Sequence, residues 1–341
     1  MLPGETVVGY EMRGKVVLVT GATGFIGSHV AERLLQNGAR VRAMVRNPAK
    51  AAGLERAGAF VVAGDMTDPG LLERAVEDCQ AVFHFAGTTN EFKPRAHFER
   101  VNIEGTRLLA EAALRESVER FIHVSSVWVY GLWSGPETRE TSPCRESGQA
   151  YSDTKLEAER VIRRLIDEKG LPAIILQPSE VYGPGDPNWT ERPLDLIKTG
   201  RMVLANGGRG LIQPVFIDDL VQGVLAAAEN GGLGETYILG GPDVVAVREY
   251  FSHFARMLGK GRLPSLPGRL ALATATVAEW VARISRRAPV FTRQEVLSTM
   301  ATATYDCRKA ERELGFAAKT TLAEGMAKIE SWLRANHKLP G

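Results

Sequence analysis

The sequence predicts an α/β fold with a doubly wound parallel sheet, and three observations lead to this prediction. Short apolar runs alternate with longer stretches at helical spacing through the first half of the chain, as successive βαβ units do. The first apolar run, residues 16–19, leads directly into a glycine-rich turn. After about residue 180 the pattern becomes less regular and richer in turns. We therefore expect a Rossmann sheet followed by a smaller C-terminal α/β lobe.

Each strand of the sheet is expected at a short apolar run, which is typical of strands buried on both faces. The predicted strands cover residues 16–19, 40–45, 59–63, 81–85, 120–124 and 173–176. Helices are expected between them, the longest at residues 95–116, and another at residues 151–168. Right-handed crossovers would place these helices on both faces of the sheet.

The turn after the first strand reads TGATGFIG, and its glycines have separate predicted roles. Gly21 allows the tight turn, Gly24 lets the backbone approach a pyrophosphate, and Gly27 lets the helix pack closely on the sheet. The first amides of that helix are unpaired and favour a phosphate. The spacing is one residue longer at its start than the usual fingerprint, but its place between strand and helix indicates dinucleotide binding. The expected contacts with the cofactor are Gly21, Thr23, Gly24, Phe25, Ile26 and Gly27.

The turn also suggests how the chain divides. Residues 1–14 read as an N-terminal extension, and residues 15–179 as the dinucleotide-binding domain. Residues 180–341 are expected to form mainly a substrate-binding lobe, with some segments returning to the first domain. Open α/β sheets bind ligands at the carboxyl ends of their strands, so the lobe should cover that edge.

The end of the second strand predicts which dinucleotide is bound. An acidic residue there would accept hydrogen bonds from the ribose of NAD, but this chain has Arg46, with Lys50 one turn further on. Arg42 is expected on the same face of the strand as Arg46. A guanidinium can stack on adenine and pair with a 2′-phosphate. We therefore expect NADP, with NAD as the alternative; a solvated surface arginine is the structural alternative for Arg46.

Two further strand ends are expected to contact the cofactor. Asp65 could accept a hydrogen bond from the adenine amino group, and Met66 could pack on the ring. After the fourth strand, the small residues Ala86 and Gly87, preceded by Phe85, would let the backbone approach the cofactor closely.

A tyrosine and a lysine four residues apart give the candidate chemistry. Tyr151 and Lys155 share one face of a predicted helix. A free phenol titrates near pH 10, and a neighbouring ammonium is expected to lower that pKa. Tyr151 could then exchange a proton with a substrate oxygen, while Lys155 also holds the cofactor ribose. Ser126 ends the fifth strand and could hydrogen-bond the reacting oxygen.

The composition excludes several other classes of protein. The net charge of +2 and the lack of a long basic block give no support for nucleic-acid binding. The three cysteines are far apart, and neither they nor the histidines have metal-ligand spacing, so no metal is expected. No secretory signal or integral membrane segment is predicted, since the apolar stretch 270–284 is too short to span a bilayer. A reduced, cytoplasmic protein is the expectation.

Eight segments together resemble the extended short-chain dehydrogenases/reductases, the superfamily of NAD-dependent epimerases and dehydratases. They are TGATGFIG, HFAG, VNIEGT, VSSVWVYG, YSDTK, LQPSEVYGPGD, VFIDDL and ERELGF, spread over nearly the whole chain. The resemblance implies that Ser126, Tyr151 and Lys155 are catalytic, and that Asn102 positions the lysine and a proton-relay water. It implies cofactor contacts also at Ser125, Pro178 and Val181. It further implies a homodimer formed by the helices at 95–116 and 151–168.

The resemblance leaves the reaction open between a reductase and an epimerase. Sugar-nucleotide epimerases commonly hold the diphosphate with an arginine near position 212, where this chain has Ile212, although Arg209 is close by. Gln177 stands where many members have arginine, and Arg46 is unusual for enzymes that keep NAD bound. These differences favour the dihydroflavonol-reductase and 3β-hydroxysteroid-dehydrogenase branch, with a ketone or secondary alcohol as substrate. A nucleotide-sugar epimerase or dehydratase is the alternative, and a non-catalytic dinucleotide sensor is a third hypothesis.

The predicted substrate is apolar. Trp128, Trp133 and Trp189 would line an apolar pocket if they face the cleft, and core or surface packing is the alternative. Residues 263–287 could form a helix that roofs this pocket, or one that touches a membrane surface.

Overall fold

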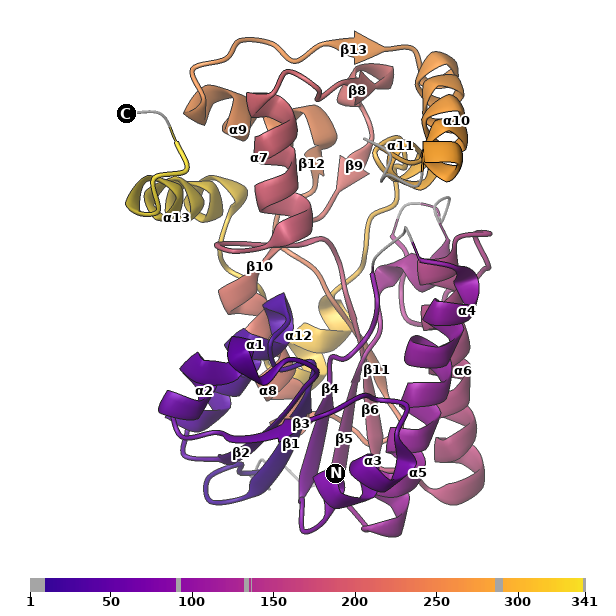
Figure 1. Cartoon of the computed structure of the whole chain (residues 1–341), viewed down its shortest axis with the longest axis vertical. Helices are drawn as coiled ribbons and strands as arrows, with labels where there is room; N and C mark the ends of the chain where they lie inside the picture. Colours follow the sequence, from indigo (N-terminus) through magenta and orange to yellow (C-terminus); the bar gives the residue numbers. More distant parts are fainter. Residues whose placement is uncertain (1–9, 90–92, 132–134, 136, 286–290, 340–341) are drawn as a thin grey trace.

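The computed structural model describes residues 10–89, 93–131, 135, 137–285 and 291–339 (Figure 1). Within them, a seven-stranded parallel sheet forms the lower part of the molecule as drawn. Its strands are β1 (Val16–Thr20), β2 (Arg40–Val45), β3 (Phe60–Ala63), β4 (Ala81–His84), β5 (Arg120–Val124), β6 (Ala173–Pro178) and β11 (Thr236–Leu239). All six strands predicted from the apolar runs are present, with ends that differ by up to two residues from the predicted ranges.

The strand order is β11-β6-β5-β4-β1-β2-β3, so the order reverses between β1 and β4. In an open sheet the crevice for a ligand lies at this reversal, beyond the carboxyl ends of the strands. The glycine turn leaves β1 at that end, and residues 85–87 leave β4 beside it. The doubly wound architecture predicted from the sequence is confirmed.

Helices cover both faces of the sheet (Figure 1). One face packs on α1 (Phe25–Gln36), α2 (Ala52–Arg56) and α8 (Ile217–Asn230), and the other packs on α3 (Pro69–Val76), α5 (Gly105–Arg115) and α6 (Ala150–Lys169). Alternate residues of β1 divide between the two cores: Val17 and Val19 lie in the first, and Leu18 lies in the second. Burial on both faces explains why these strands are continuous apolar runs.

The helix predicted at residues 95–116 is not one regular α-helix. A short α4 (Arg95–Phe98) leads into wider π-helical turns at Glu99–Glu104, and α5 follows. Such turns insert an extra residue into the helix and are frequent at functional sites. The longest described helix is α6, with 20 residues. The sequence periodicity did not reveal the wider turns.

The segments after β6 form a less regular part above the carboxyl ends of the strands (Figure 1). Its short strands pair as β7 (Val181–Tyr182) with β10 (Val215–Phe216), β9 (Leu211–Ile212) with β12 (Val245–Ala246), and β8 (Leu204–Ala205) with β13 (Ser265–Leu266). Its helices are α7 (Arg192–Lys198), α9 (Val247–Met257), α10 (Gly268–Ser285), α11 (Arg293–Ser298) and α13 (Leu322–Ala335). The strand β11 and helices α8 and α12 (Arg308–Leu314) return to the sheet.

Candidate active site

The glycine turn has the geometry that its sequence predicts. Gly21 has φ +67°, and a Cβ there would lie 2.8 Å from the amide nitrogen of Ala86. A Cβ on Gly27 would lie 2.3 Å from the carbonyl oxygen of Gly21. Gly24 begins α1, and no side chain caps the helix. The turn therefore packs closely against the end of β4. Because no side chain caps α1, its first backbone amides can bind an anion.

The basic residues after β2 lie near the loop that follows β3. Arg46 and Lys50 are exposed. The pKa of Asp65 is lowered, first by its hydrogen bond from the Thr67 hydroxyl and further by the charges of Arg100 and Arg46. Arg100, which the sequence analysis missed, comes from the π-helical turns and is distant in sequence from the other groups. Only the fold brings it to this corner of the site.

Arg42 and Met66 both contact helices on one face of the sheet. Arg42 donates hydrogen bonds to the carbonyl oxygens of Arg74, Ala75 and Glu77, at 3.2, 2.8 and 2.7 Å. It therefore stabilises the C-terminal end of α3. Met66 is buried in the core against α5, and a Cβ on Gly105 would lie 3.2 Å from the Met66 Cβ.

Tyr151, Ser126 and Trp128 lie together where β5 meets α6. The Ser126 hydroxyl hydrogen-bonds Tyr151 and also accepts from the amide of Trp128 at 3.3 Å. The Trp128 ring meets Tyr151 edge-on, with centroids 6.4 Å apart. Ser126 is buried, and Tyr151 is partly exposed at the start of α6. A phenol, a hydroxyl and an apolar ring thus lie in contact where β5 ends and α6 begins.

Lys155 lies one helical turn after Tyr151 on α6. Its ammonium donates to the carbonyl oxygen of Val124 at 2.7 Å, and burial lowers the pKa of Lys155 to about 8. A Cβ on Gly87 would lie 3.7 Å from Lys155 Nζ and 3.3 Å from Asn102 Oδ1. The absence of a side chain at Gly87 therefore leaves room where lysine and asparagine converge.

The expected lowering of the Tyr151 pKa is wrong for this structure. Burial raises that pKa, and the hydrogen bond with Ser126 lowers it by less. The Lys155 ammonium is instead held by the carbonyl oxygen of Val124. Desolvation of the phenolate outweighs the hydrogen bond with Ser126, because burial penalises the charged form directly.

Asn102 connects the π-helical turns to α6. Its Oδ1 accepts from the amide of Thr88 at 2.8 Å, and its Nδ2 donates to Thr154 Oγ1 at 3.1 Å. Thr154 precedes Lys155 on α6, and its hydroxyl donates to the carbonyl oxygen of Ala150 at 2.6 Å. Asn102 is buried. These bonds hold the loop after β4 against the helix that carries Tyr151 and Lys155.

A buried chain of hydrogen bonds lies behind Asn102. The Thr106 hydroxyl donates to the Asn102 carbonyl at 2.6 Å, so its oxygen must accept from His84 Nε2, 2.8 Å away. His84 Nδ1 then accepts from the Thr20 hydroxyl at 2.8 Å, and Thr20 accepts from the amide of Ala86 at 3.2 Å. Burial lowers the pKa of His84 to about 3, which keeps it neutral. His84 is therefore a packed strand residue.

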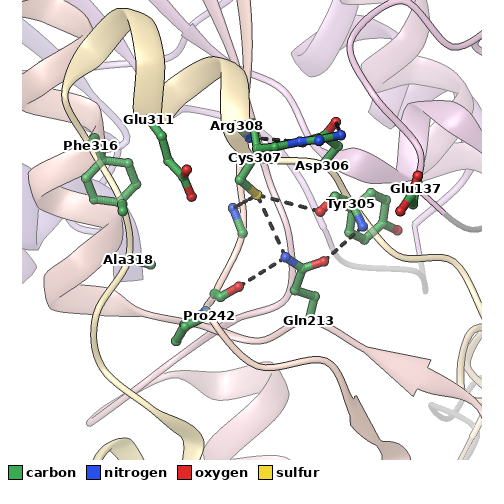
Figure 2. Close-up of a pocket in the computed structure, with 13 residues that line it drawn as sticks. Glu137, Gln213, Pro242, Tyr305, Asp306, Cys307, Arg308, Glu311, Phe316 and Ala318 are labelled. Carbon is green, nitrogen blue, oxygen red and sulfur yellow. Dashed lines mark hydrogen bonds and ion pairs between the residues drawn. The ribbon is translucent and has the colours of Figure 1, made fainter.

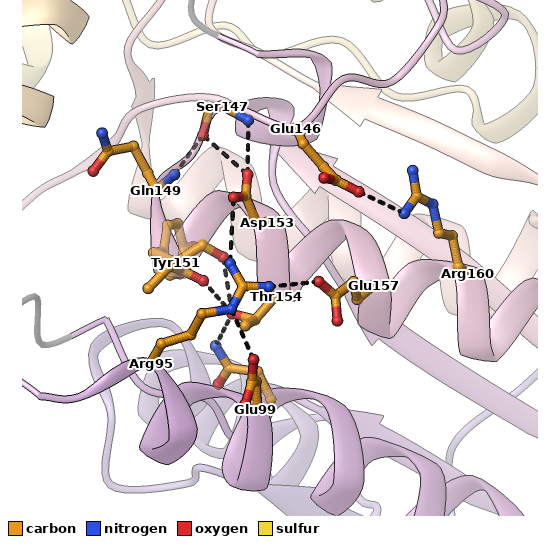
Figure 3. A network of polar contacts seen from close by, with 12 residues as sticks. Arg95, Glu99, Glu146, Ser147, Gln149, Tyr151, Asp153, Thr154, Glu157 and Arg160 are labelled. Carbon is orange, nitrogen blue, oxygen red and sulfur yellow. Dashed lines mark hydrogen bonds and ion pairs between the residues drawn. The ribbon is translucent and has the colours of Figure 1, made fainter.

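An ion-pair network fixes the start of α6 (Figure 3). Arg95 on α4 contacts Glu99, Asp153 and Glu157, with N–O distances of 2.7, 3.6 and 2.8 Å. Asp153 also accepts from the amide of Ser147 at 2.7 Å and thereby holds the loop before α6. The α6 residues of this network alternate with Tyr151 and Lys155, so it fixes how that helix faces the cleft.

The remaining predicted cofactor contacts gather at the carboxyl ends of β4, β5 and β6. The Ser125 hydroxyl is buried and has no hydrogen-bond partner among the described residues. Phe85 is half-buried after β4, Pro178 ends β6, and Val181 begins β7. A buried hydroxyl without a partner at this edge fits a ligand with polar groups, since such groups are normally satisfied.

Three residues used to distinguish reductase from epimerase have clear positions. Ile212 is buried in β9, and Arg209 is exposed before it. Gln177 is buried in β6, where it accepts from the Tyr130 hydroxyl at 2.6 Å and donates to Glu159 at 3.0 Å. Because Gln177 belongs to this interior network, its difference from arginine says nothing about the substrate.

The tryptophans do not form a common pocket wall. Trp189 stacks on Phe251 and meets Tyr250 edge-on, which places it in the packing around α9. Trp128 lies at Tyr151, as described above. Trp133 lies outside the described residues.

A separate cavity of about 300 Å³ lies beside the start of α12 (Figure 2). Gln213, Tyr305, Cys307 and Phe316 are among its lining residues, and it contains none of the predicted site residues. Burial raises the pKa of the Cys307 thiol to about 12, and its sulfur accepts from the amide of Gly240 at 3.2 Å. This thiol is therefore not activated as a nucleophile.

The fold and this geometry define a class: a doubly wound α/β protein with a dinucleotide turn and a Ser–Tyr–Lys cleft. The family model described as NAD dependent epimerase/dehydratase family matches residues 17–240. The chain therefore belongs to that family, within the extended short-chain dehydrogenases/reductases, and is an NAD(P)-dependent enzyme of that type.

Relatives in this family include reductases and a dehydratase. A 4-hydroxy-2-methyl-3-oxo-4-farnesyl-3,4-dihydroquinoline-1-oxide ketoreductase of Stigmatella aurantiaca is 29% identical, over 90% of this chain and 93% of that protein. A putative dihydroflavonol 4-reductase of Synechocystis sp. is 30% identical, over 94% of each. The structure of DesIV, a dTDP-glucose 4,6-dehydratase of Streptomyces venezuelae with NAD and TYD bound, is 26% identical, with TM-score 0.78 over 95% of this chain and 98% of that one.

The described residues contain neither a membrane-spanning helix nor a metal-binding cluster. None of their helices is long and apolar enough to cross a membrane. Within the same residues, no group of three or more His, Cys, Asp or Glu side chains is placed to hold a metal ion.

Proposed function

We propose that this protein is an NADP(H)-dependent oxidoreductase that transfers hydride between nicotinamide and a ketone or secondary alcohol. The observation that carries the proposal is the convergence of Ser126, Tyr151, Lys155 and Asn102 beside the glycine turn. Lys155 and Asn102 approach the space above Gly87, and Tyr151 bonds Ser126 at the mouth of the same cleft. The unpartnered Ser125 hydroxyl and the uncapped start of α1 fit a dinucleotide at this edge.

When bound, the nicotinamide supplies or accepts the hydride. For reduction, Ser126 holds the substrate carbonyl oxygen by a hydrogen bond, and Tyr151 gives its phenolic proton to that oxygen. The Lys155 ammonium stabilises the phenolate that remains and bonds the cofactor ribose. Asn102 fixes Thr154 and the loop at Gly87, which positions the lysine. Arg46 and Lys50 bind the 2′-phosphate.

The proposed substrate is small and apolar at the reacting end. Trp128 offers an apolar ring beside Tyr151. The Stigmatella relative is named as a ketoreductase of a farnesylated quinoline oxide, and the Synechocystis relative as a dihydroflavonol reductase. Position 212 in β9 is a buried isoleucine and offers no positive charge for a diphosphate, although the exposed Arg209 precedes it. These observations favour net reduction over epimerisation or dehydration of a nucleotide sugar.

Two assays test the proposal. Purified full-length protein is incubated with NADPH or NADH and a panel of aryl, alicyclic and steroid ketones, and nicotinamide absorbance is followed. In parallel, UDP- and dTDP-sugars are tested for thermal protection. NADPH oxidation with a ketone is the expected result. Protection by a nucleotide sugar without ketone turnover would establish the alternative, and no turnover with either class would favour a dinucleotide sensor. The homodimer stays a prediction, to be checked by light scattering.

Arg46→Asp is expected to reverse the cofactor preference. Removing the guanidinium and adding a carboxylate should weaken NADPH binding by about 10- to 100-fold, because a charged hydrogen bond contributes roughly 1.5–3 kcal/mol. The carboxylate should at the same time improve NADH binding. Dissociation constants for both cofactors are measured by fluorescence titration. Arg40→Asp is the matched control, since Arg40 is exposed at the opposite end of the same strand. An unchanged NADPH/NADH ratio for Arg46→Asp contradicts the assignment.

Ketone reduction is expected to slow as the pH rises above about 8. The pKa of Lys155 is lowered to about 8, so the ammonium is present below that pH and is lost above it. Its loss removes the charge that stabilises the phenolate of Tyr151. The pH profile of kcat/KM for NADPH, which reports the free enzyme, should therefore fall above about pH 8. In Lys155→Arg the charge persists, so the falling limb should move to higher pH; a limb that stays in place contradicts the prediction.

A further inference from the structure

The largest apolar side chains of the helix α10 face solvent rather than the protein. The fully buried residues of the helix are small: Ala271 and Ala275 pack with Ala205 and Val296, and Leu272 is partly buried against the same cluster. The large apolar residues face outward, with exposed fractions of 55% at Leu270, 61% at Val277, 64% at Trp280, 49% at Val281 and 65% at Ile284. A helix that simply completes a core shows the opposite pattern.

Most of the exposed large hydrophobic residues in the described part of the chain lie on this outward face. Of nine exposed large hydrophobic residues in the described part of the chain, five lie on α10. Leu270 lies seven residues, about two helical turns, before Val277, and the other four lie within eight residues, so that all five share one face of the helix, its apolar stripe. In Figure 1, α10 lies at the outer edge of the upper part, with α11 beside it on the inner side. Contiguous apolar surface of this kind marks an interaction site.

The segment of sequence that contains α10 is strongly positive. Residues 260–293 contain seven lysines and arginines and one acidic residue, a net charge of +6 in a chain whose net charge is +2. Arg269 is exposed at the start of α10, whereas Lys260 donates to the carbonyl oxygens of Ile197 and Lys198 at the end of α7, at 2.6 and 2.8 Å. The acidic residue, Glu279, accepts a hydrogen bond from the amide of Arg293 at 2.7 Å. An occupant of the stripe therefore meets a basic border and should itself be anionic.

We propose that α10 is a peripheral membrane-docking helix that inserts its apolar stripe into the surface of a bilayer containing anionic lipid. Trp280 and the aliphatic side chains would enter the boundary between headgroups and acyl chains, and the basic border would pair with lipid phosphates. Since none of the described helices can span a membrane, the helix lies along the surface. A second copy of the chain fits less well, because a twofold interface would bring two segments of charge +6 together.

The experiment is co-sedimentation of the full-length protein with vesicles. One set is phosphatidylcholine alone, and the other contains about a third phosphatidylglycerol. The wild type should bind the anionic vesicles, and binding should weaken as salt is raised. Trp280→Ser/Ile284→Ser should reduce the affinity by about tenfold or more, because apolar burial drives insertion. Arg269→Glu should reduce binding to the anionic vesicles alone.

The controls separate this proposal from a folding defect and from self-association. Phe60→Ser removes an equally exposed hydrophobic residue from β3 and should bind vesicles like the wild type. All variants should keep the melting temperature and NADPH affinity of the wild type. The proposal is overturned if the wild type binds neither vesicle, or if the α10 double variant binds as well as the wild type. It is also overturned if light scattering shows a dimer that the double variant converts to a monomer.

Discussion

Replacing Tyr151 by phenylalanine is expected to lower kcat for ketone reduction by about a thousandfold, because proton transfer by a positioned side chain contributes roughly 10²–10⁴. The substitution removes only the hydroxyl that hydrogen-bonds Ser126. The ring remains beside Trp128, so the cleft should keep its shape. NADPH affinity should change little, since Lys155, Asn102 and the glycine turn are untouched.

Steady-state kinetics and an NADPH titration together test this prediction. Tyr10→Phe is the matched control: its hydroxyl donates to the carbonyl oxygen of Gln80 at 3.3 Å, near the amino ends of the strands and away from the cleft. It should retain the wild-type kcat. If Tyr151→Phe turns over ketones at the wild-type rate, the assignment of Tyr151 as proton donor is wrong, whatever cofactor the protein binds.

Gly27→Ala is expected to destabilise the protein by about 3 kcal/mol and to remove most NADPH binding. The added Cβ would lie 2.3 Å from the carbonyl oxygen of Gly21 and 2.9 Å from its carbonyl carbon. These are backbone atoms of a turn that is itself pressed against Ala86, so the clash cannot be relieved by a rotamer change. Moving α1 away would displace the amides proposed to bind the pyrophosphate.

Thermal melting and an NADPH titration measure both effects. Gly53→Ala is a matched control with the opposite expected sign. Gly53 lies in α2 with no atom within 4 Å of an added Cβ, so alanine there should stabilise the protein by about 0.5–1 kcal/mol. Equal melting temperatures and cofactor affinities for Gly27→Ala and the wild type would show that the close packing at this turn is not required.

The strands of the sheet were predictable because each signal is local. A short apolar run such as Val16–Thr20 has its side chains buried on both faces, and the packing of alternate residues into two cores confirms this. The glycine turn was predictable for the same reason, since the constraints on Gly21 arise within the turn and at one neighbouring strand end. Tyr151 and Lys155 share a face because four residues make about one helical turn.

The errors arose where a side chain had partners distant in sequence. Strand alternation placed Arg42 on the face of Arg46, but it did not reveal that the carbonyl oxygens at the end of α3 bind the Arg42 guanidinium. The proximity of Lys155 predicted a lowered Tyr151 pKa, but burial has the larger effect and raises it. The wide turns that contain Asn102 have no periodic signal, because one extra residue in a helix leaves the apolar spacing nearly unchanged.

By itself the sequence determined six of the seven strands of the sheet, the dinucleotide turn and the residue types of the candidate site, but not β11. Local hydrophobic periodicity and backbone freedom specify these features without reference to the rest of the chain. The tertiary structure alone decided that Arg100 reaches Asp65, that Gln177 is an interior residue, and that the large side chains of α10 face outward. Burial and the direction of a side chain depend on which segments pack together, and that is settled only when the whole chain has folded.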